Sequence, residues 1–303
     1  MAEFLTLSLT PMLIASLAAI ACALPGNFLL LSGRAMLGDA MSHVVLPGIV
    51  AGFLLTGSAA GIVMGAGALA AAGLSALMIE VVTTRARMEP GAAMAVVFTA
   101  MFALGVLLLE VTGTGAVHLD VEHALYGNLE SLIWLQATNV GSLIDPEALA
   151  GLPPALLRLA VIAALIAGAL ALFWRALVAT TFDPTFARTS GIPTGLVMAG
   201  LTAATALAAV AAFQAVGSVL TIAMLICPPA TARLLTRRLP SQIALSCLFA
   251  LIAANAGYVL AGYAPGWIGL SFTVSASGMI ATVAGLMLAI AALVPSQARL
   301  AAL

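Results

Sequence analysis

The chain has 303 residues, of which 63% are hydrophobic and 7% charged, and its net charge is −1. A soluble domain carries roughly 25% charged residues, so this composition excludes an ordinary water-facing surface. The net charge gives no support to nucleic-acid binding, and the three cysteines, which lie in apolar runs without a CxxC spacing, predict packed free thiols.

The apolar runs, taken in chain order, predict membrane-spanning helices. They are about 20 residues long, which suits a helix that crosses a hydrocarbon core of roughly 30 Å and not the shorter alternating strands of a barrel. We therefore predict an all-α, polytopic transmembrane bundle that forms a single transmembrane domain over residues 1–303, with about nine spans and with eight or ten as alternatives. The predicted spans are approximately 9–31, 40–57, 58–82, 92–112, 156–178, 194–215, 216–234, 242–263 and 268–294.

The orientation follows from the ten basic residues, all of which are arginine. If segment 83–91 is cytoplasmic, every arginine except Arg158 lies on that side, as the positive-inside rule expects. With nine spans, the N-terminus is then external, the C-terminus is cytoplasmic, and the long segment 113–155 is external. Within this segment, residues 121–136 mix apolar and acidic side chains with Trp134, which predicts a helix lying partly in the membrane interface.

The first polar stretch, 34–48, contains Asp39 and His43. Their spacing of four places both on one helix face, and ionisable groups inside a membrane usually face a pathway or a partner. A carboxylate with an imidazole suits Mn, Zn or Fe(II), and a transit site must bind weakly enough to release its ion. The alternatives are that Asp39 is only a helix N-cap and that His43 only bonds a neighbouring helix.

The second polar stretch, 181–193, interrupts two spans on the arginine-rich side. Asp183 followed by Pro184 predicts a capped helix start, and Gly191 followed by Pro193 predicts its end. A short exposed helix of this kind suits docking on a cytoplasmic partner, and an ordinary interhelical loop is the alternative.

The third stretch, 215–235, carries Pro228 and Pro229 inside an apolar run. Paired prolines remove two backbone donors and predict a broken helix. Such breaks often line the path of a transporter, although a kink that serves packing alone is the alternative.

Enzyme signatures are missing from the sequence. It contains no GxxxxGK[ST], no HExxH and no GxSxG pattern, so we expect neither ATP hydrolysis nor hydrolase chemistry in this chain.

Together the three stretches resemble motifs of the ABC-3 family of metal permeases, the membrane subunits of bacterial manganese, zinc and iron uptake systems. Residues 34–48, 183–191 and 216–235 each resemble one family motif, and 125–129 (Leu-Tyr-Gly-Asn-Leu) resembles a fourth. The sequence Cys227-Pro228-Pro229 departs mildly from the family pattern, in which many relatives have an aliphatic residue, Pro and Ala.

The resemblance implies a non-catalytic permease subunit in the bacterial inner membrane that holds no permanent cofactor and translocates a divalent metal ion. It implies a second permease subunit, in a homodimer or a heterodimer, with cytoplasmic ATP-binding subunits and an external metal-binding solute-binding protein as partners, and membrane lipid around the bundle. The residues carried over are Asp39 and His43 as metal contacts; Asp183, Pro184, Ala187, Arg188 and Gly191 in an ATPase-coupling helix; and Gly217, Pro228 and Pro229 in a pathway-adjacent broken helix.

Two other function classes are alternatives to this one. A secondary, proton-coupled metal transporter needs acids deep in several spans, whereas Glu80 and Glu110 lie near predicted span ends and only Asp39 is a central candidate. A membrane scaffold without transport is the third class. The predicted topology also places Asp39 near the cytoplasmic start of its span, while a transit ligand is expected nearer the membrane centre. The sequence leaves this point and the identity of the metal open.

Overall fold

The computed structural model describes residues 4–57, 61–111, 129–137, 140–267, 269 and 274–293. This part of the chain consists of helices and short connections without a strand, which confirms the all-α prediction. Eight of its helices are long and apolar enough to cross a membrane, and they match eight of the nine predicted spans. The ninth prediction, 40–57, falls on α3 (Met36–Thr56), whose described apolar run is Pro47–Thr56.

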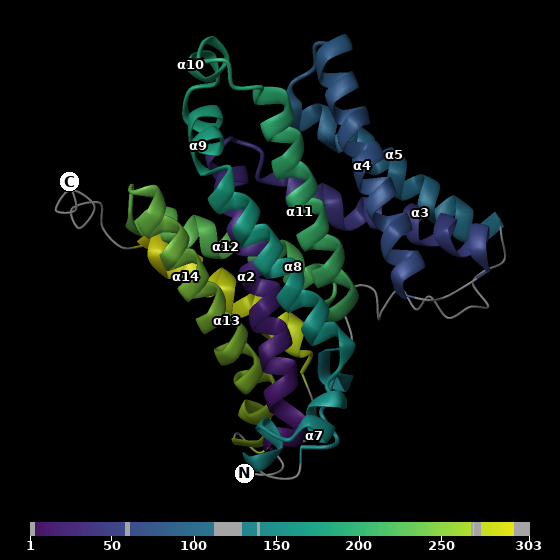
Figure 1. Cartoon of the computed structure of the whole chain (residues 1–303), viewed down its shortest axis with the longest axis vertical. Coiled ribbons are helices and arrows are strands. Elements are labelled where there is room, and N and C mark those ends of the chain that lie inside the picture. The colour runs from purple at the N-terminus through teal and green to yellow at the C-terminus, as the bar shows by residue number, and fades with distance from the viewer. Residues whose placement is uncertain are drawn as a thin grey trace. The chain divides into compact units, whose positions relative to one another are not determined.

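The chain forms two compact units (Figure 1). Unit 1 comprises residues 1–27, 122–167 and 211–303, and unit 2 comprises 28–121 and 168–210. The helical elements, in chain order, are η1 (Leu5–Leu9), α2 (Thr10–Leu31), α3 (Met36–Thr56), α4 (Gly61–Arg85), α5 (Pro90–Val111), η3 (Leu129–Ser131), η4 (Val140–Leu143), α7 (Pro146–Ala150), α8 (Pro154–Leu172), α9 (Trp174–Phe182), α10 (Pro184–Thr189), α11 (Thr194–Val216), α12 (Ser218–Leu235), α13 (Leu239–Trp267) and α14 (Ala276–Leu293).

In unit 1, α12, α13 and α14 pack against one another. Their contact is close because glycine lets backbones approach. A Cβ atom added at Gly257 of α13 would lie 2.4 Å from the Cα atom of Ile280 in α14, so no larger residue fits there without a shift of the helices. Leu220, Met224 and Ile280 are fully buried in this core.

A buried polar cluster joins α2 to α13 in unit 1. The Asn27 amide donates to the Ser246 hydroxyl and to the Ala23 carbonyl, each at 2.7 Å, and its Oδ1 accepts from the Gln242 amide at 3.0 Å. The Asn27, Gln242 and Ser246 side chains are completely buried. Because an unpaired amide in such surroundings is costly, the cluster favours one register between the two helices.

The segment that begins at residue 129 differs from the prediction. Instead of an interfacial helix over 121–136, its described part has the single 3-10 turn η3 followed by non-helical chain, and residues 121–128 lie outside the described part. Trp134 is 1% exposed, and its indole donates to the Ala148 carbonyl at 2.7 Å. Its backbone N–H donates to the Thr6 carbonyl at 2.9 Å. Trp134 is thus a core residue of unit 1 and not an interface anchor, since these contacts bury it.

In unit 2, α3, α4 and α5 pack together, and glycines set the crossing of α3 and α4. A Cβ atom at Gly67 would lie 2.2 Å from the Gly48 carbonyl oxygen, and one at Gly48 would lie 2.2 Å from the Gly67 carbonyl oxygen. One turn on, a Cβ at Gly52 would lie 3.1 Å from the Val63 carbonyl oxygen. Small residues four apart allow this backbone contact in a membrane helix pair.

We expect Gly67→Ala to destabilise unit 2 by roughly 1–3 kcal/mol, because overpacking must push α3 and α4 apart. The matched control is Gly200→Ala in α11, where an added Cβ meets no atom within 4 Å; helix propensity should make this change neutral or slightly stabilising. The midpoints of thermal unfolding of the two variants in detergent provide the measurement. Equal midpoints would contradict the assigned helix contact.

We expect Asn27→Leu to destabilise the chain by roughly 1–3 kcal/mol, since it leaves the buried Gln242 amide without its acceptor. The double variant Asn27→Leu, Gln242→Leu removes both partners, so its loss should be smaller than the sum of the two single losses. Thermal unfolding of the four proteins in the cycle measures this coupling, and strict additivity would disprove it.

Candidate functional site

The stretch with Asp39 and His43 lies in the first two turns of α3, in unit 2. The helix begins at Met36, and its N-cap is Ala35, whose side chain makes no capping bond. Asp39 is therefore the fourth residue of the helix and not its N-cap, which removes that alternative. The backbone places Asp39 and His43 one turn apart on one helix face. The side chains of both residues lie outside the described part of the structure.

The neighbours of this pair hold the start of α3 within unit 2. Leu37, Ala40 and Val44 are at most 4% exposed. One side of the start of α3 is therefore packed within unit 2, while Met36, its first residue, is 64% exposed. Further along, Pro47 lacks the amide hydrogen that a helix offers to the carbonyl four residues earlier, so the His43 carbonyl has no helical donor.

The predicted short helix at 183–191 is present as α10, and both of its ends are capped as the sequence indicated. The Asp183 carboxylate accepts from the Phe186 N–H at 2.8 Å, with Pro184 at the first helical position. At the other end, the Ile192 N–H donates to the Ala187 carbonyl and the Gly191 N–H to the Arg188 carbonyl. This pair of bonds is a Schellman motif, and Gly191 supplies the positive φ of 78° that it needs.

One face of α10 is anchored and the other is exposed. Ala187 is completely buried, and the Arg188 Nε donates to the Thr194 hydroxyl at the start of α11 at 3.1 Å. Phe186, by contrast, is 61% exposed. The short helix therefore presents an aromatic side chain from a rigid support, a combination that is typical of a docking element.

The break in the third stretch lies at Gly217 and not at the prolines. Gly217 separates α11 from α12 with φ 83° and ψ 173°, a conformation essentially reserved for glycine. Polar side chains satisfy the carbonyls around it. The Ser277 hydroxyl donates to the Val216 carbonyl at 2.8 Å, and the Thr221 hydroxyl donates to the Gly217 carbonyl at 2.7 Å.

The predicted broken helix at Pro228 and Pro229 is wrong, because α12 continues through both residues to Leu235. A proline at position 229 leaves the Leu225 carbonyl without its helical donor. The backbone of α2 covers that oxygen, since a Cβ atom at Gly26 would lie 2.3 Å from it. Membrane helices tolerate prolines when a neighbouring helix covers the freed groups, and Gly26 permits that approach here.

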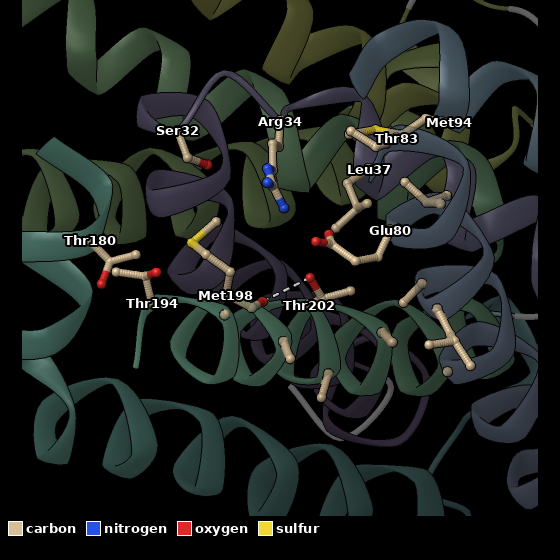
Figure 2. Close-up of a pocket in the computed structure, with 18 of the residues that line it drawn as sticks. Ser32, Arg34, Leu37, Glu80, Thr83, Met94, Thr180, Thr194, Met198 and Thr202 are labelled. Carbon is tan, nitrogen blue, oxygen red and sulfur yellow. Dashed lines mark hydrogen bonds between the residues drawn. The ribbon is translucent and has the colours of Figure 1, made fainter. Parts of the chain in front are cut away.

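A cavity of about 650 Å³ lies within unit 2, lined by the α2–α3 connection and by α3, α4, α5, α9, α10 and α11 (Figure 2). Arg34 and Glu80 point into it from the α2–α3 connection and from α4 (Figure 2). Arg188 and the hydroxyl side chains of Thr180 and Thr181 also line it. No motif in the sequence predicts this cavity. The run Thr180-Thr181 before Asp183 was the only local signal, and it indicates nothing without its tertiary neighbours.

No group of three or more His, Cys, Asp or Glu side chains that could hold a metal ion occurs among the residues that the structure describes. Within that part, the three cysteines are free thiols, as predicted. The Leu125–Leu129 element is described only at Leu129, which is fully buried in η3.

Comparison with known proteins gives relatives along almost the whole chain. A manganese transport system membrane protein, MntD of Bacillus subtilis, is 39% identical over 269 residues, which cover 89% of this chain and 85% of the relative. A zinc transport system membrane protein, TroD of Treponema pallidum, is 35% identical over 92% of this chain and 71% of the relative.

The fold matches a solved structure described as PsaBC from Streptococcus pneumoniae in complex with Fab. The TM-score is 0.74 at 27% sequence identity, over 96% of this chain and 92% of that chain. The model of the family described as the ABC 3 transport family matches residues 4–144 and 148–295. This chain, a multi-pass membrane protein, therefore belongs to the ABC 3 transport family.

Proposed function

We propose that this chain is the membrane-spanning permease subunit of an ATP-binding cassette importer for a divalent transition metal ion. The family match along nearly the full length carries this proposal. The names of the relatives, which are manganese and zinc transport system membrane proteins, support the class of cargo. Manganese and zinc are the favoured cargoes, and iron belongs to the same class.

The proposed metal contacts are Asp39 and His43. A carboxylate oxygen and an imidazole nitrogen on one helix face form a mixed ligand pair that suits Mn(II), Zn(II) or Fe(II). The His43 carbonyl oxygen, which Pro47 leaves without a helical donor, is a third candidate ligand atom close to this pair. A site with so few protein ligands binds the ion only transiently, as passage requires. The metal is the cargo, and the proposed subunit holds no permanent cofactor.

The proposed energy source is a pair of cytoplasmic ATP-binding subunits, because this sequence has no nucleotide-binding signature and the chain is proposed to be non-catalytic. Asp183, Pro184, Ala187, Arg188 and Gly191 form the capped element α10, which supports the proposal that it transmits ATPase movement. Its capped ends and the Arg188 contact with Thr194 make it stiff enough to pass a displacement on to α11.

The segment around Gly217, Pro228 and Pro229 is proposed to lie beside the pathway. Two helices that meet at a glycine in a conformation closed to other residues resemble the discontinuous helices of transporters. The remaining partners are a second permease subunit, identical or related, and an external metal-binding protein, and the proposed location is the inner membrane of a bacterium.

Asp39→Ala and His43→Ala are each expected to lower uptake of radiolabelled Mn²⁺ or Zn²⁺ by cells more than about tenfold. Losing a residue that merely supports a metal ligand already costs 10–100-fold in affinity. The matched control is the exposed acid Glu89→Ala, in the α4–α5 connection. Immunoblots of membranes check insertion, and normal transport by both variants would refute the ligand assignment.

Uptake that stops with ATP depletion but survives a protonophore separates this importer from a proton-coupled carrier.

Phe186→Ser is expected to weaken binding of the ATP-binding subunits by about tenfold or more, as an exposed aromatic at an interface centre typically would. The substitution should leave the thermal midpoint of this chain nearly unchanged, because Phe186 is 61% exposed. The matched control is Ile144→Ser, an 84% exposed apolar residue in the segment predicted to be external. Co-purification from membranes measures the binding. Full recovery of the ATPase by a variant with residues 183–192 scrambled would exclude the docking role.

A further inference from the structure

The cavity of unit 2 contains hydroxyl groups that have no partner among the described residues. Hydroxyls in the helices of this unit normally donate to the carbonyl four residues earlier, as Ser75, Thr99 and Thr202 do at 2.7–2.9 Å. Thr180 and Thr181, in the last turn of α9, make no such bond, and their Oγ1 atoms are buried without a partner. Thr180 is only 4% exposed and lines the cavity.

The charges around these hydroxyls favour an anion. Arg34 and Arg188 line the cavity together with one acid, Glu80, so that the lining carries a net charge of +1. Arg188 uses its Nε on Thr194, which leaves other guanidinium nitrogens as donors. A single net positive charge matches a monoanion such as a phosphodiester better than a dianionic phosphomonoester, because Glu80 repels a second negative charge.

The rest of the lining is mostly apolar, with the hydroxyl residues Ser32, Thr83, Thr194 and Thr202 among it, and it follows the helices away from this charged end. Along α11 it extends from Thr194 to Ala206, a helical rise of twelve steps that spans about 18 Å. One leaflet of a hydrocarbon core measures about 15 Å, so the cavity is as deep as an acyl chain in a single leaflet. Leu77, which lines the cavity from α4, is 61% exposed. In a bilayer, such an exposed apolar edge faces hydrocarbon.

We propose that this cavity binds one anionic phospholipid from the cytoplasmic leaflet, with the phosphodiester near Arg34, Arg188 and Thr180 and an acyl chain between α4 and α11. The cytoplasmic position rests on the arginine distribution of the sequence. Basic pockets between membrane helices on this side are a known way of holding acidic headgroups. The lipid would couple the packing of α4 and α11 to the position of α10, since Arg188 belongs to both the cavity and α10.

The test uses the full chain, purified in mild detergent with the subunits that accompany it. The thermal unfolding midpoint is followed during titration with phosphatidylglycerol, with the zwitterionic phosphatidylcholine, or with inorganic phosphate. Phosphatidylglycerol should raise the midpoint and the other two should not. Arg34→Gln should weaken the phosphatidylglycerol effect about tenfold, because it removes charge-assisted hydrogen bonds. The control Arg85→Gln, an exposed arginine outside the cavity lining, should change it less than about twofold.

Thr180→Val separates ligand binding from a purely structural role. Replacing a buried hydroxyl that has no partner by a methyl group should raise the midpoint without lipid, while it lowers the affinity for phosphatidylglycerol. A residue that served packing alone would move both quantities in the same direction.

Equal losses in Arg34→Gln and Arg85→Gln would overturn the proposal in favour of general surface attraction. Phosphate acting as well as the lipid would assign the cavity to a small anion. No response to any additive, as when another protein chain covers the cavity, would also overturn it.

Discussion

The hydrocarbon of a lipid bilayer offers no hydrogen bonds to a polypeptide, so the backbone N–H and C=O groups of the spans must be bonded or covered inside the protein. Long helices satisfy most of these groups, and the informative places are those where a helix cannot. At Gly217 the chain leaves helical geometry, and the hydroxyls of Ser277 and Thr221 bond the carbonyls around the break. At Pro229 the helix continues, and the freed Leu225 carbonyl lies against Gly26 of α2.

Close backbone contact between helices is a second consequence of the lipid surroundings. Without a hydrophobic force between helices in lipid, association depends on short-range packing and on hydrogen bonds. The glycines of α3 and α4 meet this need in unit 2, where Gly48 and Gly67 approach to a distance that excludes any side chain. In unit 1, the Asn27 cluster adds directional bonds between α2 and α13. The glycine contact holds the helix that carries Asp39 and His43, the residues of the proposed transit site.

The helix α10 is built differently, because it lies at a chain reversal that the arginine distribution assigns to the cytoplasm. Its stability is local: a carboxylate cap, a proline at the first position and a Schellman motif that ends at Gly191. Such an element keeps its shape without a large core behind it. Its exposed aromatic and its shared residue with the cavity make it the natural point at which a cytoplasmic partner and a bound lipid would influence the same helix, α11.

The sequence alone determined the features that depend on composition or on neighbouring residues. The low share of charge fixed the membrane class, the apolar runs located eight described membrane helices, and Asp183, Pro184 and Gly191 specified both ends of α10. The resemblance of short motifs to the ABC-3 family identified the family that the full-length match establishes. These inferences succeed because each signal acts within a few residues or within one span.

Only the tertiary structure decided where groups distant in sequence meet. The prolines of α12 predicted a break, yet the helix continues because Gly26, some 200 residues earlier, covers the freed carbonyl. The stretch 121–136 predicted an interfacial helix, yet its Trp134 is buried by contacts with Thr6 and Ala148. No pattern of neighbouring residues predicts the Asn27 cluster or the cavity around Thr180. In each case the outcome depends on a partner from another helix, and local pattern carries no information about which helix supplies that partner.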